Sequence, residues 1–217
     1  MIDNRVMVPH AALDHDGYRA WVKSDEYPER VRTAFVSGYV LVEMTPESIS
    51  AHNQVKLAFT ETLGAFVREH DLGTLYPDGL LITNEGAELS CEPDLTFISW
   101  ATFEAGGVQL VPRATGPDHI EMLGSPDLVV EIISDSSVRK DTPLLRGAYA
   151  RAGVQEYWLV DARGADVRFE ILTAENGVFQ PGAPATEPQS SRVLSGRWAL
   201  TRARNRVGHF TYTLACL

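Results

Sequence analysis

Residues 127–134 read DLVVEIIS, an almost continuous apolar run that one glutamate interrupts. Such a run is typical of a β-strand buried on both faces of a sheet. Side chains alternate between the two faces of a strand, so Glu131 points the same way as Val129 and Ile133. A carboxylate removed from water must be protonated, ion-paired or bound to a metal, because an unpaired buried charge is costly. An ion pair with an arginine, or a strand end open to water, is the alternative that this run alone leaves open.

Apolar segments on both sides of this run predict further strands. Four of them have the length and composition of strands, namely FVSGYVLVEM (35–44), TLYPDGLLIT (74–83), CEPDLTFISW (91–100) and EYWLVD (156–161). A fifth segment, DVRFEILT (166–173), alternates like a half-buried strand. Within the first of these segments, Gly38 indicates a tight turn between two strands.

Two segments have the pattern of helices. The longer one, 45–73, repeats one helix face every three or four positions, and this stripe consists of His52, Val55, Phe59, Leu63 and Phe66. Ser48 or Ser50 is placed to cap its start. The shorter one, DTPLLRGAYARAG (141–153), ends at Gly153, a typical C-terminal cap. The order of these elements predicts an α/β (α+β) fold, with a mixed central sheet flanked by helices and extra strands at the termini.

The character of the chain changes twice along its length. Residues 1–30 are polar and mixed, and we expect an N-terminal extension with a short helix. Residues 31–180 form the expected main domain, in which the Gly- and Pro-rich segment 103–126 is interpreted as a loop or insertion. From 181 a loop leads into a strand-rich C-terminal tail, 181–217, which we expect to pack on the same domain.

Composition narrows the classes of protein to which the chain can belong. With 217 residues, 44% hydrophobic and 22% charged, it has the profile of an ordinary globular domain. The net charge of −10 argues against a free-standing binder of nucleic-acid phosphates. One basic cluster nevertheless occurs, which consists of Arg139, Lys140, Arg146 and Arg151. Two distant cysteines, no signal peptide and no long apolar run predict a cytoplasmic protein without a membrane span.

Asp94 offers a partner for the glutamate of the central run. It follows Pro93 at the start of a predicted strand, and Pro-Asp alone is typical of a turn. Two carboxylates on adjacent strands can, however, converge on one divalent cation. Hard ions such as Mg²⁺ and Mn²⁺ prefer oxygen ligands. The pair of Asp94 and Glu131 therefore predicts a metal site.

Three strings of residues resemble a known family. They are EPDLTFIS (92–99), PDLVVEIIS (126–134) and YARAGVQEYWLVD (149–161), of which the third is the most specific. VEMTPESISAH (42–52) is a weaker further match. Together they resemble the Uma-two family of restriction endonucleases, which belongs to the PD-(D/E)XK nuclease superfamily. The resemblance covers about residues 31–175.

The resemblance implies a fold, an activity and a set of site residues. The fold is restriction-endonuclease-like, and the activity is Mg²⁺- or Mn²⁺-dependent hydrolysis of DNA. Asp94 and Glu131 would be the metal-binding acids, Ile132 would offer its backbone carbonyl, and His52 would lie near the site. Cutting both strands of a duplex benefits from two sites, so a homodimer is a further expectation.

The sequence departs from the superfamily where a lysine is expected. The motif places lysine two residues after the second acid, where this chain has Ile133. Relatives with a displaced lysine place it four residues before the tyrosine of YARAG, where this chain has Leu145. Arg146 is adjacent, but one step along a helix turns a side chain by about 100°. Lys140, at the junction of loop and helix, is therefore the candidate substitute catalytic residue.

Several alternatives stay open at this point. Asp127 belongs to a second Pro-Asp pair, but it lies too far along the strand from Glu131 to share one metal. His52, on an apolar stripe, could be an ordinary core or capping residue. Where an acid often follows the glycine of the first hairpin, this chain has Tyr39, and Glu43 is a candidate replacement. A catalytically impaired, nuclease-like module that binds nucleic acid or protein is the rival function, and surface acids without a site are the third reading.

Overall fold

The DLVVEIIS run is the centre of a six-stranded sheet in the computed structural model, which describes residues 6–28, 31–43, 48–113 and 116–217. The strands of this central sheet, in spatial order, are β12 (Val178–Pro181), β11 (Arg168–Glu175), β10 (Glu156–Asp161), β9 (Leu128–Ile132), β6 (Leu95–Ser99) and β3 (Gly73–Pro77). β9 runs parallel to β10 and antiparallel to β6, so the sheet is mixed.

A second six-stranded sheet, the N-terminal sheet, is formed mostly by earlier parts of the chain. Its strands, in spatial order, are β2 (Tyr39–Glu43), β1 (Arg32–Val36), β5 (Leu89–Cys91), β4 (Ile82–Asn84), β8 (His119–Gly124) and β7 (Val108–Pro112). The predicted turn at Gly38 joins β1 to β2, with positive φ angles of 50° at Ser37 and 82° at Gly38. Two consecutive left-handed residues match the right-handed twist of a hairpin.

The C-terminal tail forms a third, three-stranded sheet, the tail sheet. Its strands are β13 (Gln189–Ser190), β14 (Arg197–Arg204) and β15 (Phe210–Cys216). The helices are α1 (His15–Val22), α2 (Gln54–Glu69), α3 (Trp100–Glu104) and α4 (Arg146–Ala152), with short turns η1 (His10–Leu13), η2 (Ile49–Asn53), η3 (Glu85–Ala87) and η4 (Lys140–Leu145). No helix in the described residues is long and apolar enough to cross a membrane.

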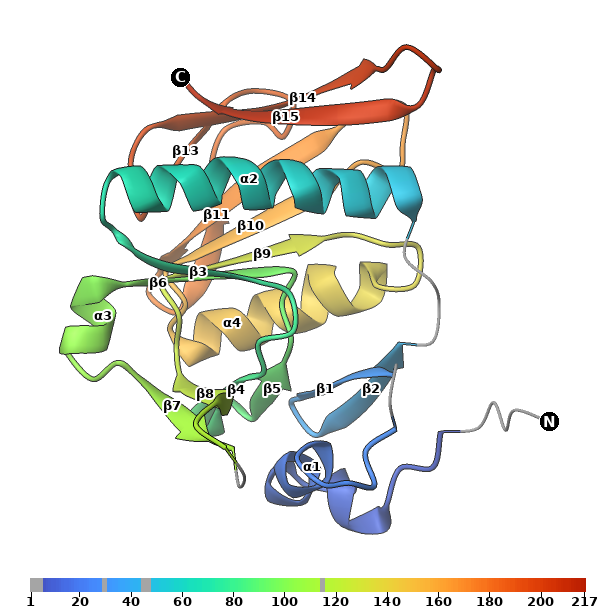
Figure 1. Cartoon of the computed structure of the whole chain (residues 1–217), viewed down its shortest axis with the longest axis vertical. Coiled ribbons are helices and arrows are strands. Elements are labelled where there is room, and N and C mark those ends of the chain that lie inside the picture. The colour runs from blue at the N-terminus through green and yellow to red at the C-terminus, as the bar shows by residue number, and fades with distance from the viewer. Residues whose placement is uncertain (1–5, 29–30, 44–47, 114–115) are drawn as a thin grey trace.

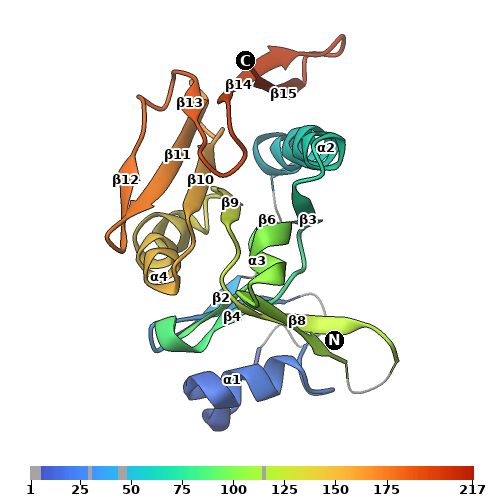
Figure 2. The ribbon, with the colours of Figure 1, turned by 90° about the vertical axis from the view of Figure 1, so that its left-hand side faces the viewer.

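The sheets and helices alternate in layers. The tail sheet, α2, the central sheet, α4, the N-terminal sheet and α1 follow one another from top to bottom of Figure 1, and Figure 2 shows the same succession from the side. Parallel strands need a crossover connection, and η4 with α4 supplies the one between β9 and β10. The fold is thus the expected mixed sheet architecture flanked by helices, with the strands divided between two large sheets.

Aromatic packing explains why α2 covers the central sheet. Phe59 of the predicted helical stripe meets Trp158 of β10 with ring centroids 6.3 Å apart. Trp158 in turn meets Trp198 of β14 at 5.5 Å. All three side chains are buried, and edge-to-face contacts at such distances add to the free energy gained from burial. Since α2 begins with η2, this core also fixes the position of His52.

The interpretation of 103–126 as a loop or insertion is wrong for most of its length. The segment contains the end of α3 and the paired strands β7 and β8. Its glycines permit a close approach of backbones, since a Cβ on Gly124 would lie 2.2 Å from the carbonyl oxygen of Gly107. The glycines in this segment allow two strands to approach each other closely. Composition alone does not distinguish glycines of this kind from glycines in a loop.

The boundary at residue 180 stays a prediction, and Leu214 offers a test of it. Its buried side chain belongs to the core that α2 shares with the central sheet. We expect Leu214→Ala to lower the free energy of unfolding of the whole chain by about 2–3 kcal/mol, as for other truncations of core leucines. Urea unfolding followed by fluorescence measures the change, with the exposed Thr213→Ala as the matched control. A tail that unfolds in a separate earlier transition would contradict this expectation.

Candidate active site

Asp94 and Glu131 lie on adjacent strands of the central sheet. β6 and β9 pair antiparallel with Leu95 opposite Val130, and extending this register by one position brings Asp94 opposite Glu131. The backbone N–H of Ile132 donates a hydrogen bond to Oδ2 of Asp94 at 2.8 Å. Asp94 is 4% exposed and Glu131 is 3% exposed. The two acids of the sequence prediction are therefore buried neighbours.

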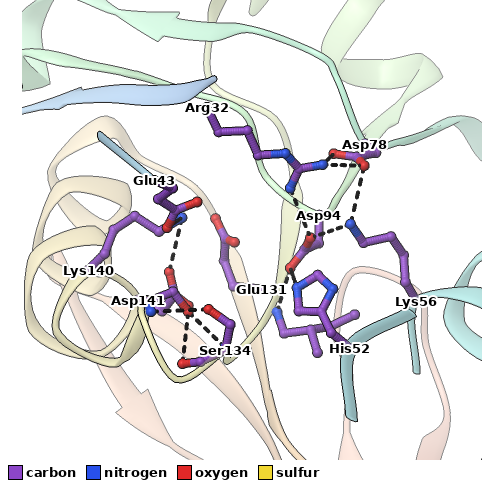
Figure 3. Close-up of polar contacts among 12 residues, drawn as sticks. Arg32, Glu43, His52, Lys56, Asp78, Asp94, Glu131, Ser134, Lys140 and Asp141 are labelled. Carbon is purple, nitrogen blue, oxygen red and sulfur yellow. Dashed lines mark hydrogen bonds and ion pairs between the residues drawn. The ribbon is translucent and has the colours of Figure 1, made fainter. Parts of the chain in front are cut away.

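Basic side chains surround Asp94 (Figure 3). Nζ of Lys56 lies 2.8 Å from Oδ1, and Nε2 of His52 lies 3.3 Å from Oδ2. The guanidinium of Arg32 is 4.0 Å from Oδ1. Asp78 accepts from both Arg32, at 2.5 Å, and Lys56, at 3.2 Å, so it holds these two cations beside Asp94.

This environment keeps Asp94 ionised. Burial by itself raises the pKa of the carboxyl group, but the contacts with His52 and Lys56 outweigh burial and lower the pKa below its ordinary value. His52 and Lys56 are four residues apart on one helical face, which explains why both reach the same carboxylate. The folded protein therefore favours the charged form of Asp94.

Glu131 has the opposite electrostatic environment. Burial raises the pKa of its carboxyl group well above the ordinary value, Lys140 opposes this shift, and Asp141 and Asp94 add to it. The hydroxyl of Tyr149 donates a hydrogen bond to Oε1 of Glu131 at 2.7 Å. Glu131 is thus fixed in position by α4, while its ionised form is disfavoured.

Lys140 lies at the start of η4 between several carboxylates. Its Nζ is 2.9 Å from Oε1 of Glu43, at the end of β2, and 3.4 Å from Oδ1 of Asp141. Burial lowers the pKa of Lys140, but Glu131, Asp141 and Glu43 raise it above the ordinary value. Lys140 therefore stays protonated and acts on this site as a cation.

Asp141 gives the site a testable pH dependence. It is 1% exposed, and Ser137 donates a hydrogen bond to its Oδ2. Burial raises the pKa of Asp141 to about 6, against the attraction of Lys140 and the bond from Ser137. Between the unfolded pKa, 3.8, and about 6 the folded state binds the extra proton, so stability falls as pH rises through this window.

Accordingly, Asp141→Asn is expected to remove this part of the pH dependence. Wild-type protein without metal should lose on the order of 2 kcal/mol of unfolding free energy between the two ends of this window because of this one group. Urea unfolding at several pH values measures the loss, and Asp118→Asn, at an exposed aspartate, is the control. Equal slopes in wild type and Asp141→Asn would contradict the assignment.

One surface depression lies along η4 and another along the loop that follows β9. The first is lined by Glu43 and Lys140 together with Arg139. The second is lined by Ser134, two residues after Ile132, and by Arg163. Neither depression is lined by Asp94 or Glu131, which are both buried.

The oxygen donors of this site fit a hard divalent cation. No group of three or more His, Cys, Asp or Glu side chains in the described part of the chain is arranged to hold a metal ion. Mg²⁺ is commonly bound by only one or two carboxylates, with waters and substrate phosphates as further ligands. The neighbouring carboxylates of Asp94 and Glu131 are oxygen donors of this kind. Burial is the main cause of the raised pKa of Glu131, and the neighbouring carboxylates Asp141 and Asp94 add to it.

A family comparison agrees with this geometry. The sequence profile of the family named Uma2, described as "Putative restriction endonuclease", matches residues 18–203. The chain belongs to the Uma2 family. The resemblance inferred from the three strings of residues is thereby confirmed, and the match extends beyond the region that they cover. No curated protein sequence matches the chain.

A solved structure shows that the fold of this Uma2 protein is shared. It is the crystal structure of a putative nuclease of the DUF820 family from Anabaena variabilis ATCC 29413. The two chains are 13% identical, with a TM-score of 0.57 over 75% of this chain and 83% of that chain. At this identity the likeness supports the fold, which is the expected one.

Sequence reasoning missed three residues of the candidate active site. Lys56 lies one helical turn after His52, and this spacing is the signal that could have found it. Asp141 and Tyr149 lie in the predicted helix 141–153. Asp141 contacts its neighbour in the chain, Lys140, whereas Tyr149 reaches Glu131 on β9, a contact that the local sequence does not reveal.

Three further residues discussed in the sequence analysis, Asp127, Ile133 and Leu145, lie outside the candidate active site. Asp127 accepts hydrogen bonds from the backbone N–H of Ser99, the N-cap of α3, and from the hydroxyl of Thr102, so it supports the start of α3. Ile133 and Leu145, at the two positions expected to carry lysine, are buried in the core around α4.

Proposed function

We propose that this Uma2 protein is a metal-dependent nuclease that hydrolyses phosphodiester bonds of DNA. The observation that carries the proposal is the pairing of two buried carboxylates, Asp94 and Glu131, with a lysine beside each of them. Membership of a family described as restriction endonucleases supports the reaction class. DNA as the substrate and the metal requirement are parts of the proposal.

Mg²⁺ or Mn²⁺ is the proposed cofactor, held by Asp94, Glu131 and the backbone carbonyl of Ile132. When bound, such an ion activates water and offsets the charge of the reacting phosphate. The protein fixes this donor set in advance: the N–H of Ile132 orients Asp94, and Tyr149 orients Glu131. A preorganised carboxylate pair needs little rearrangement when substrate arrives.

Lys56, Lys140 and His52 have proposed roles in charge and proton transfer. Hydrolysis joins a water oxygen to phosphorus and breaks the bond to a sugar oxygen, which must then gain a proton. Lys140 stays charged, so it stabilises negative charge on the phosphate group. Lys56 is a second cation at the site, and His52 is within reach of Asp94 to relay a proton.

A binding module without turnover is the second candidate function. It is favoured by the two apolar residues, Ile133 and Leu145, where the superfamily places its lysine. It is also favoured by the ion pair between Asp94 and Lys56, which already neutralises one metal-binding acid. Under either function, recognition of a duplex by a homodimer is part of the proposal, because two copies place one site on each strand.

A nicking assay separates these functions. Wild-type protein is incubated with supercoiled plasmid and Mg²⁺ or Mn²⁺, and with EDTA as the control. Thermal melting with and without the same ions measures metal binding independently of turnover. Metal-dependent nicking supports the nuclease, whereas metal-dependent stabilisation with no nicking supports the binding module. If neither ion raises the melting temperature, the proposed metal site is wrong.

A further inference from the structure

A strongly basic hairpin stands out in this acidic protein. The full chain has a net charge of −10, yet residues 197–217 contain four arginines and no aspartate or glutamate. These residues form β14 and β15, which pair antiparallel from Trp198 opposite Cys216 to Arg204 opposite Phe210. Positive charge is therefore concentrated on one two-stranded ribbon.

The ribbon changes character along its length. On the face that contains Trp198 and Leu214, the side chains near the open end are buried against α2. Toward the turn, the same face presents Arg202, Arg204 and Phe210, because alternate residues share a face. We call residues 202–210 the hairpin tip.

An aromatic ring orders the arginines of the hairpin tip. The guanidinium carbons of Arg202 and Arg204 each lie 4.3 Å from the ring centroid of Phe210. Arginine stacked on an aromatic face loses less freedom when it binds a ligand, since part of its conformation is already fixed. Arg204 and Arg206 are exposed, and no ion pair among the described residues uses either of them. Arg204 donates one hydrogen bond to the carbonyl oxygen of Gly208 within the turn, and its remaining N–H groups and the Arg206 side chain can meet an external anion.

Hydrogen bonds connect the hairpin tip to the loop after β10. Arg202 donates to the carbonyl oxygen of Gly164 at 3.0 Å, in the loop after β10. The next residue back, Arg163, lines the depression that also contains Ser134, two residues after Ile132. In Figure 1 the turn of the hairpin lies on the side of the molecule where α2 begins, and β15 contacts η2.

We propose that the hairpin tip binds the phosphate backbone of duplex DNA and guides it to the candidate active site. Arg204 and Arg206 are the proposed phosphate ligands, and Arg202 is the positioning residue that anchors the tip to the loop after β10. We choose DNA as the partner because of charge complementarity: exposed arginines on a two-stranded ribbon can bind a regularly spaced row of phosphates. The inference rests on the proposed function, since it supplies the surface on which the substrate lies.

The hairpin lies at the end of the region that matches the family. The Uma2 profile ends at residue 203, just before Arg204. The turn and β15 therefore lie outside the part of the chain that the family profile matches. Family membership by itself therefore does not imply DNA contact through this hairpin.

DNA binding without cleavage tests the hairpin directly. Affinity of the full chain for a short labelled duplex is measured by fluorescence anisotropy in EDTA over a series of salt concentrations. The test variants are Arg204→Gln with Arg206→Gln, and Arg206→Gln alone, whose exposed side chain makes no contact that the fold requires. The matched control is Arg68→Gln with Arg113→Gln, which removes the same charge from exposed positions away from the hairpin.

The expected result is a change in salt dependence as well as in affinity. The slope of log K against log salt should decrease by about 0.9 for each phosphate that the variant no longer neutralises, so by about two in the double variant and about one in the single variant. Affinity at moderate salt should fall about tenfold in the double variant. The Arg68 and Arg113 control should keep the wild-type slope.

The outcomes distinguish this inference from the proposed function. An unchanged slope in both hairpin variants, or an equal change in the control, overturns the hairpin inference even if wild type nicks plasmid. A changed slope only for RNA duplexes also overturns it, because the proposed partner is DNA. A smaller slope of log K against log salt in the hairpin variants supports the inference even if wild type fails to nick plasmid. In that case only the nuclease proposal is wrong.

Discussion

The Asp94→Asn variant is expected to lose metal-dependent nicking by at least about a thousandfold, the upper end of the effect of removing one preorganised electrostatic group. Asparagine keeps the size of the side chain and can still accept from the N–H of Ile132. It removes the negative charge that the proposed cation needs. Initial rates of plasmid nicking at saturating Mg²⁺ or Mn²⁺ measure the loss. Wild-type rates in the variant would exclude Asp94 as a metal ligand.

Stability without metal provides a matched control for this variant. Folding favours the charged form of Asp94, so Asp94→Asn should lower the free energy of unfolding by about 3 kcal/mol, because Lys56 and His52 lose their shared partner. Folding disfavours the charged form of Glu131, so Glu131→Gln should raise it by about 1 kcal/mol at neutral pH. Urea unfolding in EDTA measures both. Effects of the same sign would contradict the electrostatic description of the pair.

Replacing either lysine of the site with methionine is expected to slow nicking by about a hundredfold or more, as for loss of one charged group that stabilises a transition state. Methionine retains most of the apolar side chain while it removes the charge. Lys140→Met tests the substitute that the sequence indicated, and Lys56→Met tests the cation that the structure adds beside Asp94. Single-turnover rates separate the chemical step from substrate binding.

The two lysine variants also show which lysine, Lys140 or Lys56, replaces the missing catalytic lysine of the superfamily. If Lys140→Met nicks at the wild-type rate and Lys56→Met does not, the substitute lysine lies on α2, and the prediction for Lys140 is wrong. Lys23→Met is the control, because Lys23 pairs with Glu121 on β8, outside the site. A large effect of that control would show that the assay reports folding instead of chemistry.

Residues within single elements were predictable from the sequence. The apolar strand around Glu131, the long helix with its apolar stripe and the cap at Gly153 are local patterns, and the structure contains all three, with His52 in η2 just before the helix. The pairing of Asp94 with Glu131 followed from a family resemblance and from adjacent strands. Each of these signals lies within a short stretch of chain, where periodicity and turn chemistry are informative.

Contacts between distant segments were not predictable in the same way. The ion pair between Lys140 and Glu43 joins η4 to the N-terminal sheet, and nothing in either local sequence indicates the other partner. The division of the strands into two large sheets likewise depends on long-range pairing, such as that of β4 with β8. Lys56 was the exception, since its helical spacing from His52 was visible but was assigned no role.

The packing of α2 between the tail sheet and the central sheet has a consequence for substrate geometry. Thr62 of α2 donates to the carbonyl oxygen of Leu214 on β15 at 3.2 Å, and Phe66 packs on Trp198 with ring centroids 5.0 Å apart. One helix thereby fixes the separation between the arginines of the hairpin and the lysine beside Asp94. If the hairpin tip holds one phosphate of a DNA strand, this fixed separation determines which phosphate of that strand reaches the candidate active site. The distance between the bound phosphate and the cleaved one would then be a constant number of nucleotides.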